Sequence, residues 1–178
     1  MKTYNQLITK IFDSKLSLTR DSNMENKMKN TFYPHTLTNI ESYTTKHENI
    51  PYIFQRFKHK GMWEVHFGRA DTDDANEKIA YSISHPHAHK LISTAISLYK
   101  EKLDKGQPVR YYGVDSSLNN LYDKTFKHIA KKYDNLYSRD IKNFEGPDKT
   151  IHNFAREIST RDLNGDKLGL KESTFKKI

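Results

Sequence analysis

The chain has 178 residues, no cysteine and a formal net charge of +8. This length suffices for one domain with a real core, and the lack of cysteine excludes disulfide frameworks and cysteine-ligated zinc or iron–sulfur sites. No apolar run approaches the roughly 20 residues that span a bilayer, so we expect no membrane partner. The positive charge favours a polyanion such as DNA as partner, and solvated surface lysines explain it equally well.

The first 50 residues have a weaker pattern than the rest of the chain. In residues 1–13, apolar side chains recur at helical spacing, whereas Asp13–Asn30 is polar, charged and without a persistent period. Together with Thr31–Ile50, this stretch is expected to form a weakly structured approach to the domain. We expect residues 1–50 to form an N-terminal amphipathic segment and a flexible arm. The sequence leaves open whether the amphipathic segment docks on a partner or folds back on its own domain.

Alternating strands open the next part of the chain. Tyr52–Phe57 and Met62–Phe67 alternate between apolar and polar residues, and Lys58–Gly61 between them has the length of a hairpin turn. Ile79–Ser84 alternates in the same way. The pattern predicts three antiparallel strands at the start of a domain.

A helix, a strand and a second helix follow. Gly106 and Pro108 are expected to end the first helix, and its predicted buried face comprises Leu91, Ile92, Ala95, Ile96, Tyr99 and Leu103. Val109–Val114 is predicted to be a strand parallel to Ile79–Ser84, because one helix joins the two. The second helix, capped by Asp115, Ser116 or Ser117, is expected to bury Leu118, Leu121, Tyr122, Phe126, Ile129, Ala130 and Tyr133.

The C-terminal part is predicted to hold a strand at Leu136–Ile141, a short helix at Ile151–Ile158 and a polar basic tail. We therefore expect a domain over residues 51–145, with a C-terminal helix and basic tail over residues 146–178. The expected fold class is α/β, with a mixed, mostly antiparallel sheet around a central βαβα unit.

Two stretches resemble metal-binding sequences, but we expect no metal at either. The histidines of His85–His89 alternate, but Pro86 interrupts them and a helix begins there, so a turn with exposed imidazoles is expected. No other histidine or carboxylate is obviously placed to complete that site. Asp162–Glu172 is similar to an EF-hand loop, but Lys167 stands at the glycine position and Glu172 comes one residue early.

The central unit, with Asp115 and Leu121-Tyr122 at the positions of an N/D-x-x-x-x-x-L-Y pattern, resembles the second half of the GCN5-related N-acetyltransferase (GNAT) fold. The resemblance implies Tyr122 as the general acid of an acetyl-CoA-dependent enzyme. It also places the cofactor pyrophosphate on the turn before the first helix, where this chain has His85, His87, Ala88, His89 and Lys90.

The chain departs from the GNAT family at that turn. The family pattern Q/R-x-x-G-x-G/A presents bare backbone amides to the pyrophosphate. Ser84–Lys90 contains no glycine, and Pro86 has no amide to donate. We therefore expect a degenerate, non-enzymatic GNAT-like fold without a cofactor.

A second resemblance concerns proteins of tailed bacteriophages. Residues 1–13 are similar to leader peptides that send internal proteins into the proheads of large myophages. The resemblance implies a virion protein, internal to the head or structural, that is made in the host cytoplasm. It would contact other virion or capsid proteins through residues 1–13, and DNA without sequence preference. The alternatives are an acetyl-CoA-dependent N-acyltransferase and a host-takeover factor that binds a bacterial protein through its sheet face.

Overall fold

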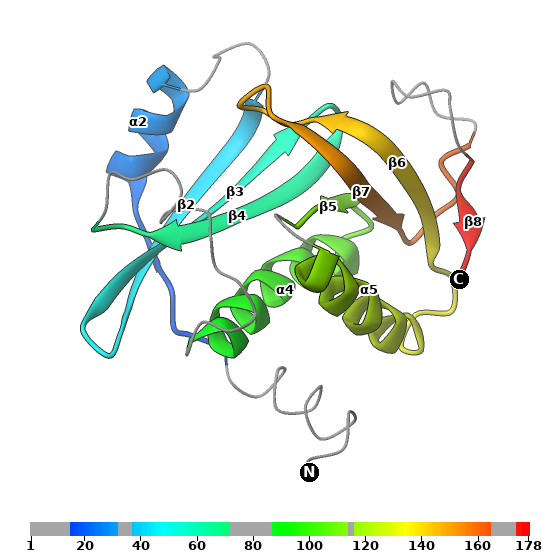
Figure 1. Cartoon of the computed structure of the whole chain (residues 1–178), viewed down its shortest axis with the longest axis horizontal. Coiled ribbons are helices and arrows are strands. Elements are labelled where there is room, and N and C mark those ends of the chain that lie inside the picture. The colour runs from blue at the N-terminus through cyan, green and yellow to red at the C-terminus, as the bar shows by residue number, and fades with distance from the viewer. Residues whose placement is uncertain (1–14, 32–36, 72–86, 114–115, 165–173) are drawn as a thin grey trace.

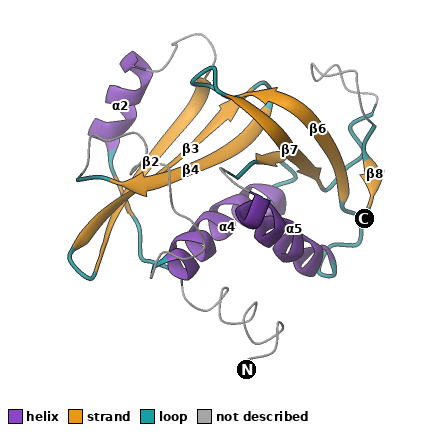
Figure 2. Cartoon of the chain, viewed as in Figure 1, coloured by secondary structure: helices purple, strands orange, loops and turns teal. Residues whose placement is uncertain are grey.

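The computed structural model describes residues 15–31, 37–71, 87–113, 116–164 and 174–178. Within these ranges the chain forms an eight-stranded sheet with the order β1-β2-β3-β4-β5-β7-β6-β8. Helices α4 and α5 lie on one face of the curved sheet, and α2 lies beside β2 (Figures 1 and 2). The fold is α/β with a mixed sheet, as predicted, and among the described strands only the β4–β5 pair is parallel.

The elements run in chain order with the following bounds. The strands are β1 (Thr19–Arg20), β2 (Leu37–His47), β3 (Ile50–His59), β4 (Met62–Arg69), β5 (Val109–Tyr111), β6 (Tyr137–Glu145), β7 (Ile151–Ser159) and β8 (Lys176–Lys177). The helices are α2 (Ser22–Thr31), α4 (Ala88–Asp104) and α5 (Ser116–Ala130). The sheet therefore contains strands from all three segments into which the sequence was divided.

The predicted hairpin between β3 and β4 is confirmed. The two strands pair antiparallel from Tyr52 with Arg69 to His59 with Met62. Trp63 packs in the core beneath α4, and Glu64, the next residue, lies on the opposite face of the sheet.

Both central helices are confirmed; on α5, the burial of Leu118 lies outside the description, and Leu121, Ala130 and Tyr133 are partly buried against the core. All six residues predicted for the buried face of α4 are buried. Gly106 follows α4 with a φ of 69°, and its amide donates to the Leu103 carbonyl at 2.9 Å, which is the expected helix stop. On α5, Tyr122, Phe126 and Ile129 are buried in the same core, which fills the space between the sheet and the two helices.

The predicted helix at Ile151–Ile158 is wrong, because this segment is strand β7, paired with β5 and β6. Its apolar residues have helical spacing, but two of its polar residues, Glu157 and Ser159, are buried and do not face solvent. Glu157 is fully buried between Arg110 and Arg139. Strand β7 places this carboxylate between arginines of the neighbouring strands β5 and β6. The spacing of the apolar residues alone does not indicate that a charged residue is buried there.

The N-terminal arm was also predicted wrongly in its local structure. Strand β2 occupies 11 residues of the stretch that was expected to be weakly structured. Its polar side chains are used in contacts, as Glu41 shows by binding Arg56 and Lys102. Before it, α2 begins after Asp21, whose carboxylate accepts from the Met24 amide at 3.0 Å.

One of the remaining predictions falls on residues that the structure does not describe, and the others are corrected by it. Ile79–Ser84 lies outside the described residues, and the described neighbours of β5 are β4 and β7. Strand β5 is shorter than predicted and ends at Tyr111. The stretch expected to be a polar tail includes β8, and its Phe175 is buried with Leu163 against Met62.

Candidate functional site

Strands β4 and β5 are adjacent and parallel, but they share a single residue pair, Trp63 with Val109. Trp63 donates its amide to the Pro108 carbonyl at 3.0 Å. Alternate residues of a strand present backbone groups to the same edge, so those of Val65 also face the β5 side. The Tyr99 hydroxyl of α4 binds both groups: it accepts from the Val65 amide at 3.1 Å and donates to the Val65 carbonyl at 3.4 Å.

Tyr122, the predicted catalytic residue of an acyltransferase, lies on α5 and is 3% exposed. Its ring meets the ring of Tyr99 edge-on, with centroids 6.3 Å apart, and lies 5.1 Å from the ring of Tyr111. Burial raises the pKa of the Tyr122 hydroxyl well above its ordinary value. In this structure Tyr122 packs in the aromatic core around Tyr99, and its role as an acid stays a prediction.

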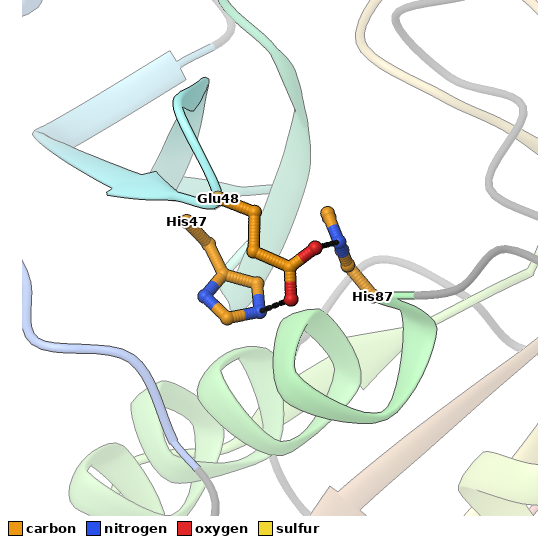
Figure 3. Close-up of side chains that lie close together, drawn as sticks. All are labelled: His47, Glu48 and His87. Atoms are coloured by element: carbon orange, nitrogen blue, oxygen red, sulfur yellow. Dashed lines mark hydrogen bonds and ion pairs between the residues drawn. The ribbon is translucent and has the colours of Figure 1, made fainter.

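Three side chains meet where α4 begins (Figure 3). His47 ends β2, Glu48 follows it in the turn, and His87 immediately precedes α4. Glu48 lies between the two imidazoles: its carboxylate accepts from Nε2 of His87 at 2.9 Å and lies 3.6 Å from Nε2 of His47. On the other side of the His87 ring, Nδ1 lies 2.7 Å from the hydroxyl of Tyr52. Among the described residues these three offer ligand atoms that all lie within 4.8 Å of one another.

The hairpin turn between β2 and β3 explains how neighbouring residues reach one site. His47 pairs with Ile50, so Glu48 and Asn49 are the two turn residues, with φ angles of 50° and 66°. Successive side chains of a regular strand point to opposite faces, whereas this left-handed turn directs Glu48 back towards His47. The hydrogen bond from His87 lowers the pKa of Glu48, and burial lowers the pKa of His47.

The residues predicted to bind a cofactor do not share one environment. His85 lies outside the described residues. Ala88 is buried in the core, His89 is exposed and Lys90 is partly exposed. His87 was expected to be an exposed imidazole, which is wrong, because it is 8% exposed and has partners at both ring nitrogens.

The opposite face of the sheet contains a buried ionic network. Arg110 donates to Glu64 at 2.7 Å and to Glu157 at 3.0 Å, and Arg139 donates to Glu157 at 2.9 Å. The Tyr112 hydroxyl donates to the second oxygen of Glu64 at 2.8 Å. Burial opposes ionisation of Glu64, but hydrogen bonds from neighbouring histidines and the charge of Arg110 hold its pKa well below its usual range. This network joins β4, β5, β7 and β6.

The stretch similar to a calcium loop is described only as far as Asn164. The Asn164 side chain accepts from the Phe175 amide at 2.6 Å and donates to the Phe175 carbonyl at 2.9 Å. The backbone amide of Asn164 donates to the Asp162 carboxylate at 2.9 Å. In the described part, Asn164 therefore holds the segment that leads into β8.

Exposed lysines follow one another along α5 and the turn after it. Lys124 and Lys127 lie on the helix, and Lys131 and Lys132 come directly after it. Lys124 and Lys127 are three residues apart on the helix and so lie on one face, and Lys131 follows in the turn directly after it. We call these three residues the α5 lysine face.

Comparison of the chain with protein family models, with curated proteins and with solved structures gave no match. Among the helices that the structure describes, none is long and apolar enough to cross a membrane.

Proposed function

We propose that the chain is a non-enzymatic, GNAT-like protein of a tailed bacteriophage, associated with the virion and in contact with DNA. The order of the central elements supports the GNAT-like part. Strands β4 and β5 are adjacent and parallel, α4 lies between them in the chain, and α5 follows β5. The virion part is supported by the resemblance of residues 1–13 to phage leader peptides.

The main support for a non-enzymatic protein is the hydroxyl of Tyr99. Acyl-CoA carries a pantetheine arm with amide groups, and an extended arm of this kind binds a strand by pairing with its free edge groups. At Val65 both edge groups are already bound by Tyr99. Tyr99 is 2% exposed, so a cofactor arm at this position would have to displace a buried ring.

The start of α4 gives a second reason. A helix N-terminus binds phosphate through free amides and the positive end of its dipole. Here the Glu48 carboxylate lies 2.9 Å from His87, the residue that precedes the helix. A pyrophosphate placed beside this carboxylate would be repelled, because both carry negative charge.

Titration calorimetry with acetyl-CoA and the full chain tests the non-enzymatic proposal. We expect no saturable heat. Acyl transfer is the competing function, because the element order also fits it. It would require saturable binding, and turnover that Tyr122→Phe reduces while leaving acetyl-CoA binding intact. That pair of results would overturn our proposal.

The α5 lysine face supports contact with DNA. A protein that neutralises phosphates with lysines loses affinity as salt rises, with a logarithmic slope of about 0.9 per phosphate contact. Glutamine at Lys124, Lys127 and Lys131 should therefore reduce the slope by up to about 2.7 for duplexes of any sequence. A matched control replaces three exposed lysines elsewhere: Lys60, Lys105 and Lys142. An equal reduction of the salt slope in both triple variants would contradict this role. So would the absence of DNA binding by the original chain.

Mass spectrometry of purified particles tests the association with the virion. We expect peptides of this chain in particles that have been washed in high salt and treated with nuclease. Recovery from the cytosol of infected cells alone would contradict it. In that case, specific capture of one host protein would favour the host-takeover alternative.

A further inference from the structure

We propose that His47, Glu48 and His87 form a binding site for a divalent transition metal, with Zn²⁺ as the preferred ion. Two imidazoles and one carboxylate are a ligand set that zinc uses in proteins, with a fourth position left to water. In the sequence, the histidines of His85–His89 resemble metal ligands, but no further ligand that would complete a site is evident. The structure brings His87 of that stretch to two ligands from a distant hairpin.

The spacing of the ligand atoms suits one ion. Ligands at about 2.1 Å from a tetrahedral zinc ion lie about 3.4 Å from one another. Oε2 of Glu48 lies 2.9 Å from Nε2 of His87, Oε1 of Glu48 lies 3.6 Å from Nε2 of His47, and one ligand atom from each of the three residues lies within 4.8 Å of the other two. An ion can therefore replace the proton between His87 and Glu48 with small side-chain movements.

A buried neighbour orients one of the ligands. Tyr52 is fully buried, and its hydroxyl lies 2.7 Å from Nδ1 of His87. Histidines that bind a metal through one ring nitrogen usually hydrogen-bond a protein group through the other. With Nδ1 protonated and donating to Tyr52, Nε2 would present its lone pair to the ion.

The site is open on the side of Glu48. The side chain of Glu48 is 69% exposed, whereas those of His47 and His87 are 16% and 9% exposed. Water can therefore reach the fourth position.

The turn that contains Glu48 does not require glutamate, because Asn, Asp and Gly are the residues favoured at positive φ in two-residue hairpins. Glu48→Asn should therefore preserve the turn and remove the carboxylate from the ligand set.

The test uses the full chain without a polyhistidine tag, stripped of metal by a chelator. Co²⁺ serves as the spectroscopic probe and Zn²⁺ as its competitor. We expect one Co²⁺ per chain, with the intense visible bands of a tetrahedral complex, and its displacement by Zn²⁺. Zinc at 100 times its dissociation constant should raise the melting temperature by roughly 5–10 °C.

The variants separate a metal site from a merely structural cluster. Loss of a group that orients a ligand costs about 10- to 100-fold in metal affinity, so Tyr52→Phe should weaken binding by about that factor. Glu48→Asn and His47→Ala remove ligands and should weaken it at least as much, while the metal-free Glu48→Asn chain keeps its melting temperature. His89→Ala is the matched control, because His89 is exposed and close in sequence to His87.

Three results would overturn the proposal. The first is the absence of one-to-one binding by the original chain. The second is binding that neither Glu48→Asn nor His47→Ala weakens. The third is a loss of metal affinity in His89→Ala as large as in Glu48→Asn or His47→Ala, which would assign the metal to surface imidazoles. Circular dichroism of each metal-free variant shows whether a loss comes from unfolding, and Glu48→Asn keeps the test decisive if His47→Ala fails to fold.

Discussion

Tyr99→Phe removes the hydroxyl that binds the Val65 backbone of strand β4 on the side of β5. The aromatic ring stays, so its contacts with Tyr122 and Phe126 are kept. What is lost is the pair of hydrogen bonds to the Val65 backbone, at 3.1 Å and 3.4 Å. Because Val65 is 5% exposed, water cannot readily replace the hydroxyl.

The expected cost follows from those unpaired groups. A buried donor or acceptor left without a partner costs about 1–3 kcal/mol. The bond to the Val65 carbonyl is long at 3.4 Å, so most of the cost comes from the amide. We therefore expect a loss of about 2 kcal/mol in the free energy of unfolding. For a chain of this size that lowers the melting temperature by roughly 4–8 °C.

Urea denaturation followed by circular dichroism measures the loss, with an unchanged slope against denaturant as the sign that only stability has changed. Tyr133→Phe is the matched control. The Tyr133 hydroxyl donates to Asp104 at 2.6 Å in an exposed position, so its removal should cost less than about 0.5 kcal/mol. Equal, small losses in both variants would refute the assignment of the Tyr99 hydroxyl to the β4 edge.

Three further predictions concern the fold. Arg110→Met should cost about 3–5 kcal/mol in urea denaturation, because it leaves Glu64 and Glu157 buried without its guanidinium; a loss under 1 kcal/mol would contradict the network. The lowered pKa of Glu64 contributes stability that is present above the pKa of an unfolded glutamate, about 4.3, and is lost as the pH falls below it. Urea midpoints at descending pH should therefore decline less steeply in Glu64→Gln, and an equal slope would argue against this. Gly106→Ala should cost about 1–2 kcal/mol, measured by thermal melting, because φ is 69° there; no loss would contradict the left-handed helix stop.

Helices α4 and α5 and the β3–β4 hairpin could be predicted because each buries one face against one core. In α4 and α5 the apolar residues recur at helical spacing because one face of each helix is buried, and Gly106 indicates where α4 ends. Strand β7 could not be predicted in the same way. Its buried Glu157 looks like a surface residue until the arginines of the neighbouring strands are known.

The candidate sites depend on contacts that no local pattern encodes. The spacing of α4 predicted that Tyr99 is buried, but not that its hydroxyl binds the backbone of Val65. His47 and Glu48 were missed because β2 was not recognised as a strand. Asn49, which favours a left-handed turn, was the available signal for a hairpin that brings both residues to His87.

The most direct test of the central claim follows the backbone amide of Val65 by nuclear magnetic resonance while acetyl-CoA is added to the full chain. If Tyr99 occupies the β4 edge, this resonance and those of the first turn of α4 should not shift at any cofactor concentration. A saturable shift of the Val65 amide, with the change expected for a new hydrogen-bond partner, would contradict the account.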